Sequence, residues 1–201
     1  MTLIYIHGFN SSALSHKAGL VRSRMEALGR AAEYVCPELP HRPAEAIAVL
    51  ERLVLKQPQD TTLIGSSLGG YYATWLVETH GVRAVLVNPA VRPYALLEGA
   101  VGSQRNLYTG ARYEFTEEHL AELRALEVPR ITPERYLLIV RTGDEVLDYR
   151  QAVARYAQAG TIVEEGGDHG FGDFDRYLDR VLAFSSIDSH NSRPNESARG
   201  Q

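Results

Sequence analysis

The sequence contains one glycine-rich motif that is typical of a catalytic serine. Residues 65–70 read Gly-Ser-Ser-Leu-Gly-Gly and fit the pattern G-x-S-x-G, with Ser67 at its centre. An apolar run precedes the motif and a segment with helical spacing follows it, and in that context the pattern predicts a nucleophile on a sharp strand-to-helix turn. Such a turn needs small residues two positions before and after the serine, and Gly65 and Gly69 meet that need. The helix N-terminus behind Ser67 would favour developing negative charge.

Two other interpretations of this motif are weaker. Ser66 is a poor nucleophile, because the residue two positions before it is Ile64 rather than a glycine. The motif could also be a loop that merely ends a strand, but the strand before it and the helix after it favour the catalytic interpretation.

A serine hydroxyl needs a base, and the base needs a carboxylate that orients it. On folds that carry this turn, the three groups follow one another in the order Ser, acid, His. His119 lies in a charged helical stretch and is predicted to be solvated, whereas His7 precedes the serine and lies on a turn. His169 lies in a glycine-rich segment between the last apolar run and the last helical segment. We therefore predict that His169 is the base.

The orienting acid is predicted to follow the apolar run at 136–140. Three carboxylates stand there, Asp144, Glu145 and Asp148. Asp144 comes first after Gly143, where the backbone can turn, and it is the favoured acid. Glu145 and Asp148 remain competitors, and Asp148 is also explained as the cap of the next helix.

Two backbone N–H groups must stabilise the oxyanion that forms when a serine attacks a carbonyl. Leu68, the residue after the nucleophile, is predicted to supply one of them. Phe9 is predicted to supply the other, because the turn His7-Gly8-Phe9-Asn10 directly follows the first apolar run.

The elements that must position these residues alternate along the chain. Several of the short apolar runs are continuous, which is typical of strands buried on both faces. The segments between them carry apolar residues at helical spacing, as in Leu14, Ala18, Val21, Met25 and Leu28. This alternation predicts an α/β fold, a mostly parallel sheet with helices on both faces and ligands beyond the carboxyl ends of its strands. The predicted strands are 3–6, 33–36, 62–64, 84–87, 136–140 and 161–163.

Composition limits the classes of protein to consider. The chain has 201 residues, enough for one domain with its own core. Its net charge of −4 argues against a nucleic-acid partner, and no apolar run reaches the ~18 residues of a membrane span. The N-terminus lacks a signal-peptide pattern and Cys36 is the single cysteine, so we expect a cytoplasmic protein. The polar segment 185–201 is predicted to be a disordered tail after a domain at 1–184.

Together these motifs resemble the small bacterial YqiA-type esterases of the α/β-hydrolase superfamily. The resemblance implies a compact α/β-hydrolase fold, hydrolysis of simple acyl esters or thioesters, and no cofactor. It also implies trimmed N-terminal strands, because the turn at His7 normally follows the third strand of the superfamily. Residues 89–132 are predicted to form a small cap-like insertion whose aromatic side chains either build an acyl pocket or pack on the sheet. The matching segments are 7–12, 65–74, 88–93, 142–149 and 166–169.

These observations predict a serine hydrolase that cleaves small-molecule carboxylic esters through an acyl-enzyme, with Ser67, Asp144 and His169 as the catalytic residues. No cluster of metal-ligating residues has suitable spacing. An acyl-CoA thioesterase, or even a peptidase, with the same residues stays open, because pocket shape sets the leaving group. A catalytically silent hydrolase-fold binding protein is disfavoured, since it would have no reason to retain all three residues. The sequence leaves the oligomeric state open.

Overall fold

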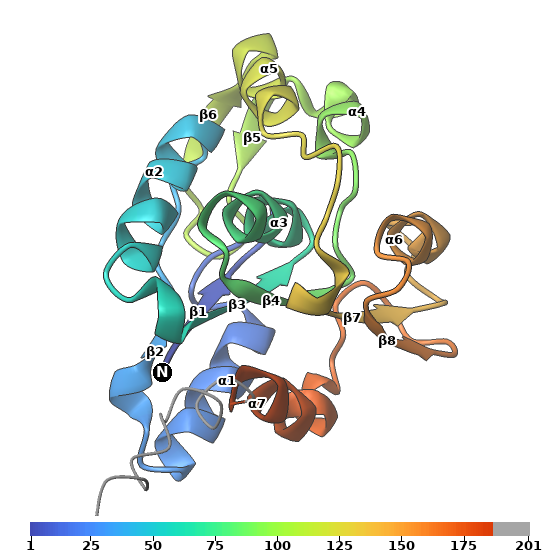
Figure 1. The fold of residues 1–201 in the computed structure, drawn as a ribbon. Coiled ribbons are helices and arrows are strands. Elements are labelled where there is room, and N and C mark those ends of the chain that lie inside the picture. Colours follow the sequence, from blue (N-terminus) through green and yellow to red (C-terminus); the bar gives the residue numbers. More distant parts are fainter. Residues whose placement is uncertain (187–201) are drawn as a thin grey trace, which may run out of the picture.

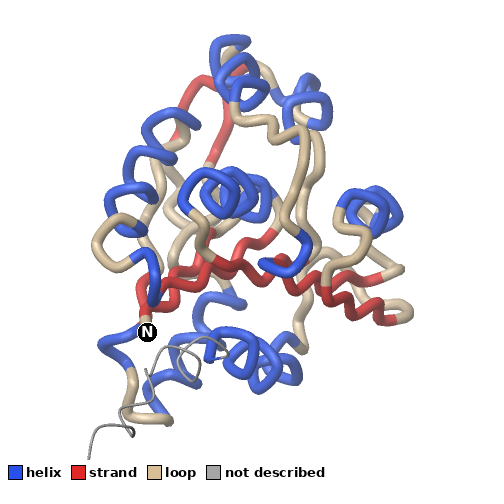
Figure 2. Tube along the Cα trace, in the orientation of Figure 1, coloured by secondary structure: helices blue, strands red, loops and turns tan. Residues whose placement is uncertain are grey.

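The computed structural model describes residues 1–186, and its centre is one parallel sheet (Figures 1 and 2). The sheet has six strands in the order β2-β1-β3-β4-β7-β8, and every neighbouring pair is parallel. The strands are β1 (Thr2–Ile6), β2 (Tyr34–Val35), β3 (Thr61–Ser66), β4 (Arg83–Val87), β7 (Tyr136–Arg141) and β8 (Gly160–Glu164).

Helices cover both faces of this sheet, as the alternating sequence predicted (Figure 1). One face carries α1 (His16–Ala27) and α7 (Leu178–Ser186), and the other carries α2 (Pro43–Val54), α3 (Leu68–His80) and α6 (Tyr149–Arg155). Side chains that alternate along each strand feed two separate cores. Ile4 and Ile6 of β1 pack on the α2 and α3 side, whereas Leu3 and Tyr5 pack on the α1 and α7 side. The central strands are therefore buried on both faces, which explains their continuous apolar runs.

Three details differ from the sequence expectations. The second strand is shorter than 33–36, because Glu33 belongs to a 3-10 turn at Ala31–Glu33. Leu14 lies outside the buried stripe of the first helix, since α1 begins only at His16 and leaves Leu14 69% exposed. Leu28 follows the end of α1 and is 43% exposed.

The boundary of the predicted tail is also corrected. Residues 185 and 186 complete α7, and the buried Ser185 hydroxyl donates a hydrogen bond to the Val181 carbonyl at 2.8 Å. The rest of the predicted tail, 187–201, lies outside the described residues. None of the helices in residues 1–186 has the length and hydropathy of a membrane span.

Residues 89–132 lie beyond α3 on its side of the sheet (Figure 1). They form α4 (Pro93–Leu96), an antiparallel hairpin of β5 (Gly102–Arg105) and β6 (Arg112–Phe115), and α5 (Glu117–Ala125). Arg42, just before α2, bonds Glu118 and Glu122 of α5 at 2.5 and 2.7 Å.

His119 is not solvated, and that prediction is wrong. The residue is only 7% exposed, and its ring stacks on Phe115 with centroids 5.2 Å apart. Its Nδ1 accepts a hydrogen bond from the Thr116 N–H at 2.8 Å, so His119 takes part in the cap of α5. The charged neighbours Glu117 and Glu118 are exposed, because they face away from the core.

Candidate active site

Ser67 lies at the junction of β3 and α3 in a backbone conformation that L-residues rarely adopt. Its φ is 56° and its ψ is −123°. Such backbone geometry costs about 1–3 kcal/mol and persists only where its surroundings hold it. The Ser67 N–H donates to the Val87 carbonyl at 3.1 Å, and the Ser67 carbonyl accepts from the N–H groups of Gly70 and Ala90 at 2.9 and 3.1 Å. Backbone contacts to β4 and the loop after it therefore hold the turn.

The glycines around Ser67 are required by close backbone approach. A Cβ atom on Gly69 would lie 2.0 Å from the Ile6 carbonyl oxygen, and one on Gly65 would lie 2.5 Å from the Gly69 carbonyl oxygen. Both distances are far below van der Waals contact, so neither position accepts a side chain without movement of the backbone. The G-x-S-x-G spacing thus lets α3 start directly against the end of β1.

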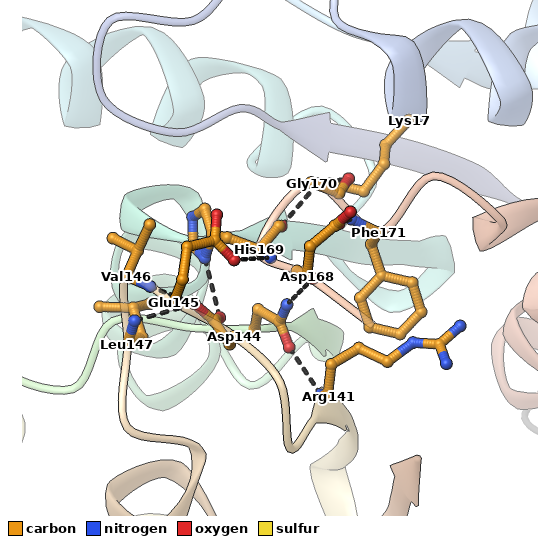
Figure 3. Close-up of polar contacts among 11 residues, drawn as sticks. Lys17, Arg141, Asp144, Glu145, Val146, Leu147, Asp168, His169, Gly170 and Phe171 are labelled. Carbon is orange, nitrogen blue, oxygen red and sulfur yellow. Dashed lines mark hydrogen bonds and ion pairs between the residues drawn. The ribbon is translucent and has the colours of Figure 1, made fainter. Parts of the chain in front are cut away.

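Asp144 and His169 come together beyond the ends of β7 and β8. The Asp144 Oδ2 atom lies 2.8 Å from His169 Nδ1 (Figure 3). The Asp144 side chain is only 2% exposed, and its Oδ1 accepts from the N–H groups of Val146 and Leu147 at 2.9 and 2.8 Å. Burial alone would raise the pKa of Asp144, but the hydrogen bonds from His169 and from these two amides hold it below its ordinary value. The ionised carboxylate can only accept, so His169 Nδ1 is the donor in this contact, and in the neutral ring the lone pair then lies on Nε2.

The other two candidate acids have different partners. Glu145 Oε2 accepts a hydrogen bond from the backbone N–H of His169 at 2.9 Å (Figure 3). Asp148 is the N-cap of α6, where its side chain accepts from the Arg150 N–H at 3.1 Å. Of the three carboxylates, Asp144 is the one that bonds the imidazole ring.

The loop that carries His169 is held on both sides by residues that the sequence did not single out. Lys17 Nζ, from α1, donates to the carbonyl oxygens of Gly170 and His169 at 2.6 and 3.5 Å (Figure 3). Asn88 Nδ2 donates to the Asp168 carbonyl at 3.3 Å, while Asn88 Oδ1 accepts from the Arg141 N–H at 2.9 Å. These contacts fix the backbone of the loop from α1, β4 and β7.

Asn88 and Lys17 differ in how far the sequence could have indicated their contacts with the loop. Asn88 directly follows the β4 run. Because ligands bind beyond the carboxyl ends of parallel strands, the sequence alone could have placed Asn88 at that edge of the sheet. Lys17 carries no such signal, because nothing in a helical segment indicates a contact with a loop near the other end of the chain. Burial lowers the pKa of Lys17 to about 8, although the nearby Asp168 and Asp144 carboxylates oppose that shift.

The Arg141 side chain packs against the same loop and the residues that follow it. Its guanidinium lies over the Phe171 ring, 4.6 Å from the centroid, and forms an ion pair with Asp173. The backbone of Gly167 passes so close that a Cβ there would lie 2.8 Å from Arg141 Cδ. Gly167 also has a φ of 74°, so close approach and backbone conformation both require a glycine.

The turn after β1 approaches Ser67 from the other side. A Cβ on Gly8 would lie 3.1 Å from Ser67 Cβ, so this turn packs directly on the serine. The Leu39 N–H donates to His7 Nε2 at 3.3 Å, which leaves the proton on Nδ1, 3.1 Å from the Gly8 carbonyl oxygen. Burial also lowers the pKa of His7. Both ring nitrogens of His7 are therefore engaged in holding the turn.

The turn lines two pockets. The larger, of about 440 Å³, contains Ser67 and His169, and the smaller, of about 210 Å³, is lined by Leu68. Phe9 borders both pockets, and its ring packs edge-on against Phe115 with centroids 5.3 Å apart. Leu68 is the first residue of α3, so its N–H has no carbonyl one turn earlier to bond. Within residues 1–186 no three His, Cys, Asp or Glu side chains are grouped to hold a metal ion.

The sequence matches the uncharacterised protein family UPF0227 over residues 2–186. The chain belongs to this family. Among its UPF0227 relatives, protein YcfP of Salmonella arizonae is 25% identical over 191 residues, which cover 92% of this chain and 99% of YcfP. This membership agrees with the resemblance to YqiA-type proteins that the motifs suggested.

Solved structures show which fold this UPF0227 chain adopts. The α/β-hydrolase domain-containing protein 10 from mouse superposes with a TM-score of 0.67 at 15% identity, over 94% of this chain and 89% of the mouse chain. Est1E from Butyrivibrio proteoclasticus, with ferulic acid bound, superposes with a TM-score of 0.62 at 15% identity, over 94% and 89% of the two chains. At these identities the likeness shows the fold, and this chain has the α/β-hydrolase fold that the resemblance implied.

Proposed function

We propose that this protein is a serine hydrolase that cleaves carboxylic esters of simple acyl chains. The observation that carries the proposal is the 2.8 Å contact between Asp144 and His169 in a pocket that also contains Ser67. An ionised acid, an imidazole with a free Nε2 and a serine on a strained turn are the parts that nucleophilic acyl transfer needs. Binding alone would not require a buried carboxylate aimed at a histidine.

In the proposed mechanism, Ser67 Oγ attacks the ester carbonyl carbon and His169 Nε2 takes the hydroxyl proton. Asp144 stabilises the imidazolium that forms. The N–H groups of Phe9 and Leu68 donate to the oxyanion of the tetrahedral intermediate. His169 then gives its proton to the departing alkoxide, so an alcohol leaves and an acyl-Ser67 ester remains.

The second half of the reaction returns the enzyme to its starting state. His169 takes a proton from a water molecule, and the hydroxide oxygen attacks the acyl carbonyl. Collapse of this second tetrahedral intermediate breaks the bond to Ser67 Oγ, which recovers its proton from His169 while the carboxylic acid leaves. The protein's own residues suffice for each proton transfer, and no cofactor is part of the proposal. An acyl-CoA thioester would follow the same steps with a thiol as the leaving group.

The setting that we propose for this reaction is the cytoplasm, because the single cysteine offers no internal disulfide. The net charge of −4 favours a small-molecule substrate over a nucleic acid.

A fluorophosphonate probe combined with hydrolysis of p-nitrophenyl acetate and acetyl-CoA tests the proposal. The wild type should be labelled once and should hydrolyse at least one of the two substrates, while Ser67→Ala should lose both labelling and turnover by several orders of magnitude. Ser66→Ala, one residue away, is the matched control and should keep the label. Labelling that persists in Ser67→Ala would contradict the assignment, and a wild type without labelling or turnover would favour the silent binding protein.

A further inference from the structure

The tip of the β5–β6 hairpin places two exposed apolar side chains at the pocket of Ser67. Leu107 is 80% exposed and Tyr108 is 46% exposed, and both line the 440 Å³ pocket together with Ser67 and His169. Loop tips are usually polar, and an isolated exposed leucine would need no explanation. Two such neighbours in the lining of a candidate active site do need an explanation.

The hairpin tip is held in a defined shape by its own hydrogen bonds. Asn106 Oδ1 accepts from the N–H groups of Tyr108 and Thr109, both at 2.9 Å. The Gly110 N–H donates to the Asn106 carbonyl at 3.0 Å, and Gly110 has a φ of 72° that a side chain would disfavour. The backbone under Leu107 and Tyr108 is therefore fixed rather than loose.

The tip is also tied to the turn that follows β1. The Leu107 N–H donates to the Asn10 carbonyl at 2.9 Å, and Asn106 Nδ2 donates to the Ser11 carbonyl at 2.7 Å. The Asn10 side chain returns the contact, because its Oδ1 accepts from the Tyr113 hydroxyl at 2.6 Å and its Nδ2 donates to Gln104 Oε1 at 3.0 Å. Polar contacts thus hold the hairpin against the residue next to Phe9, and they leave the apolar side chains free at the pocket.

The remaining lining near Ser67 offers little apolar surface. It consists largely of glycines and polar groups, among them Gly8, Lys17, Asp168 and His169. Tyr5 lines the pocket too, but it is 1% exposed and packed in the core. A substrate in this pocket can therefore remove apolar surface from water mainly against Leu107, Tyr108 and Phe9.

We propose that the hairpin tip, through Leu107 and Tyr108, binds an apolar group of the substrate and makes the enzyme prefer esters that carry one over acetate or methyl esters. The inference rests on the proposed function, since it names the substrate class of the same site. The apolar group belongs either to the acyl chain or to the alcohol. A pocket of 440 Å³ has room for such a group beside the ester, since small-molecule sites typically measure roughly 300–1,000 Å³.

The test compares wild type with the double variant Leu107→Ala/Tyr108→Ala on two series of esters. In the acyl series, p-nitrophenol is constant and the acid runs from acetate through butyrate to hexanoate. In the alcohol series, acetate is constant and the alcohol runs from methyl through butyl to hexyl. These substitutions keep Asn106 and the backbone N–H of residue 107, so the hydrogen bonds from the hairpin tip to the Asn10 and Ser11 carbonyls are retained. Leu55→Ala, which truncates a 59% exposed leucine just after α2 and outside the pocket, is the matched control.

We expect kcat/KM of the wild type and of Leu55→Ala to rise along one series, by up to about fourfold for each methylene that the pocket buries. In the double variant the rise should flatten, so that the hexyl or hexanoyl ester loses about tenfold or more while the acetate or methyl ester changes less than twofold. The series that flattens identifies the part of the substrate that contacts the hairpin.

Two results would overturn the inference alone. Wild-type rates that fall or stay level along both series would show that the pocket has no apolar preference, and a rise that survives in the double variant would place that preference elsewhere. In both cases Ser67 still reacts with the fluorophosphonate, so the proposed function stands. Absence of labelling and of all hydrolysis in the wild type would remove both proposals together.

Discussion

Glu145 and His169 are joined through the backbone, not through the imidazole ring. Glu145 Oε2 accepts from the His169 N–H at 2.9 Å, while the ring bonds Asp144 at 2.8 Å. Two adjacent carboxylates therefore act on the same histidine in different ways. Asp144 bonds the ring nitrogen Nδ1, and Glu145 holds the peptide that carries the ring. This division makes the two residues separable by mutation.

Asp144→Asn should nearly abolish turnover and leave the fold intact. The amide keeps the shape of the carboxylate but favours the wrong imidazole tautomer, which costs about 10⁴-fold in kcat in serine proteases. Asp148→Asn is the matched control, because asparagine caps helices as well as aspartate does and kcat should stay near wild type. Asp148→Ala should lower stability by about 1 kcal/mol through loss of the α6 cap. Steady-state kinetics with denaturant unfolding would measure both, and a dead Asp148→Asn beside an active Asp144→Asn would contradict the assignment.

Glu145→Gln should keep most of the activity, whereas Glu145→Ala should lose it in part. Glutamine still offers an oxygen to the His169 N–H, but alanine leaves that amide without its partner and lets the loop shift. Displacement of a catalytic group by about 1 Å can cost ~10²-fold, so we expect a loss of up to that size in kcat with little change in KM. If Glu145→Gln is as inactive as Asp144→Asn, Glu145 acts on the ring and the positioning role is wrong.

Lys17→Met should lower kcat while KM stays within about twofold. The methionine fills much of the space of the lysine, but it cannot donate to the Gly170 and His169 carbonyls that Lys17 holds. The expected loss is ~10-fold to 10²-fold, because the loop loses a support and not a reacting group. Lys56→Met, at an exposed position after α2, is the control and should behave as wild type. Wild-type kcat in Lys17→Met would show that the loop holds its position without α1.

The stability that Asp144 contributes should depend on pH. Its pKa is lowered in the folded protein, so the folded state favours the ionised form more strongly than the unfolded state does. That stability is fully present above the unfolded pKa of about 4 and is lost as the pH falls through the lower folded value.

Denaturant midpoints of wild type and Asp144→Asn at about pH 7, 5 and 3 would measure this dependence. The difference in denaturant midpoint between wild type and Asp144→Asn should be the same at the two higher pH values and smaller at the lowest pH. A difference in midpoint between wild type and Asp144→Asn that is the same at every pH would show that the hydrogen bonds to Asp144 do not stabilise its ionised form in the folded protein.

The alternation of strands and helices in the parallel sheet was predictable because its causes are local. Continuous apolar runs mark strands that are buried on both faces, and helical spacing marks the segments between them. The two misses at the ends of the first helix are local as well. Leu14 and Leu28 fit the periodicity of the first helix, but they lie just outside its ends, where a side chain no longer faces the sheet.

The sequence by itself determined the turn at Ser67, since Gly65 and Gly69 are needed wherever a strand bends so sharply into a helix. It also placed Asp144 and His169 at strand ends, on the edge of the sheet where ligands bind. It could not choose among Asp144, Glu145 and Asp148 beyond their order. That choice depends on where the loops after β7 and β8 bring their side chains, and those loops meet only when the two strands pair.

Only the tertiary structure decided what surrounds these residues. His119 became a buried helix cap because α5 packs on the core, although its neighbours in sequence are charged. Lys17 reached the His169 loop, and the hairpin tip at Leu107 reached Asn10, because the packing of α1 and of β5–β6 brings segments far apart in sequence into contact. A spacing pattern describes neighbours along the chain, whereas these contacts form between elements that share no pattern and meet only in the folded molecule.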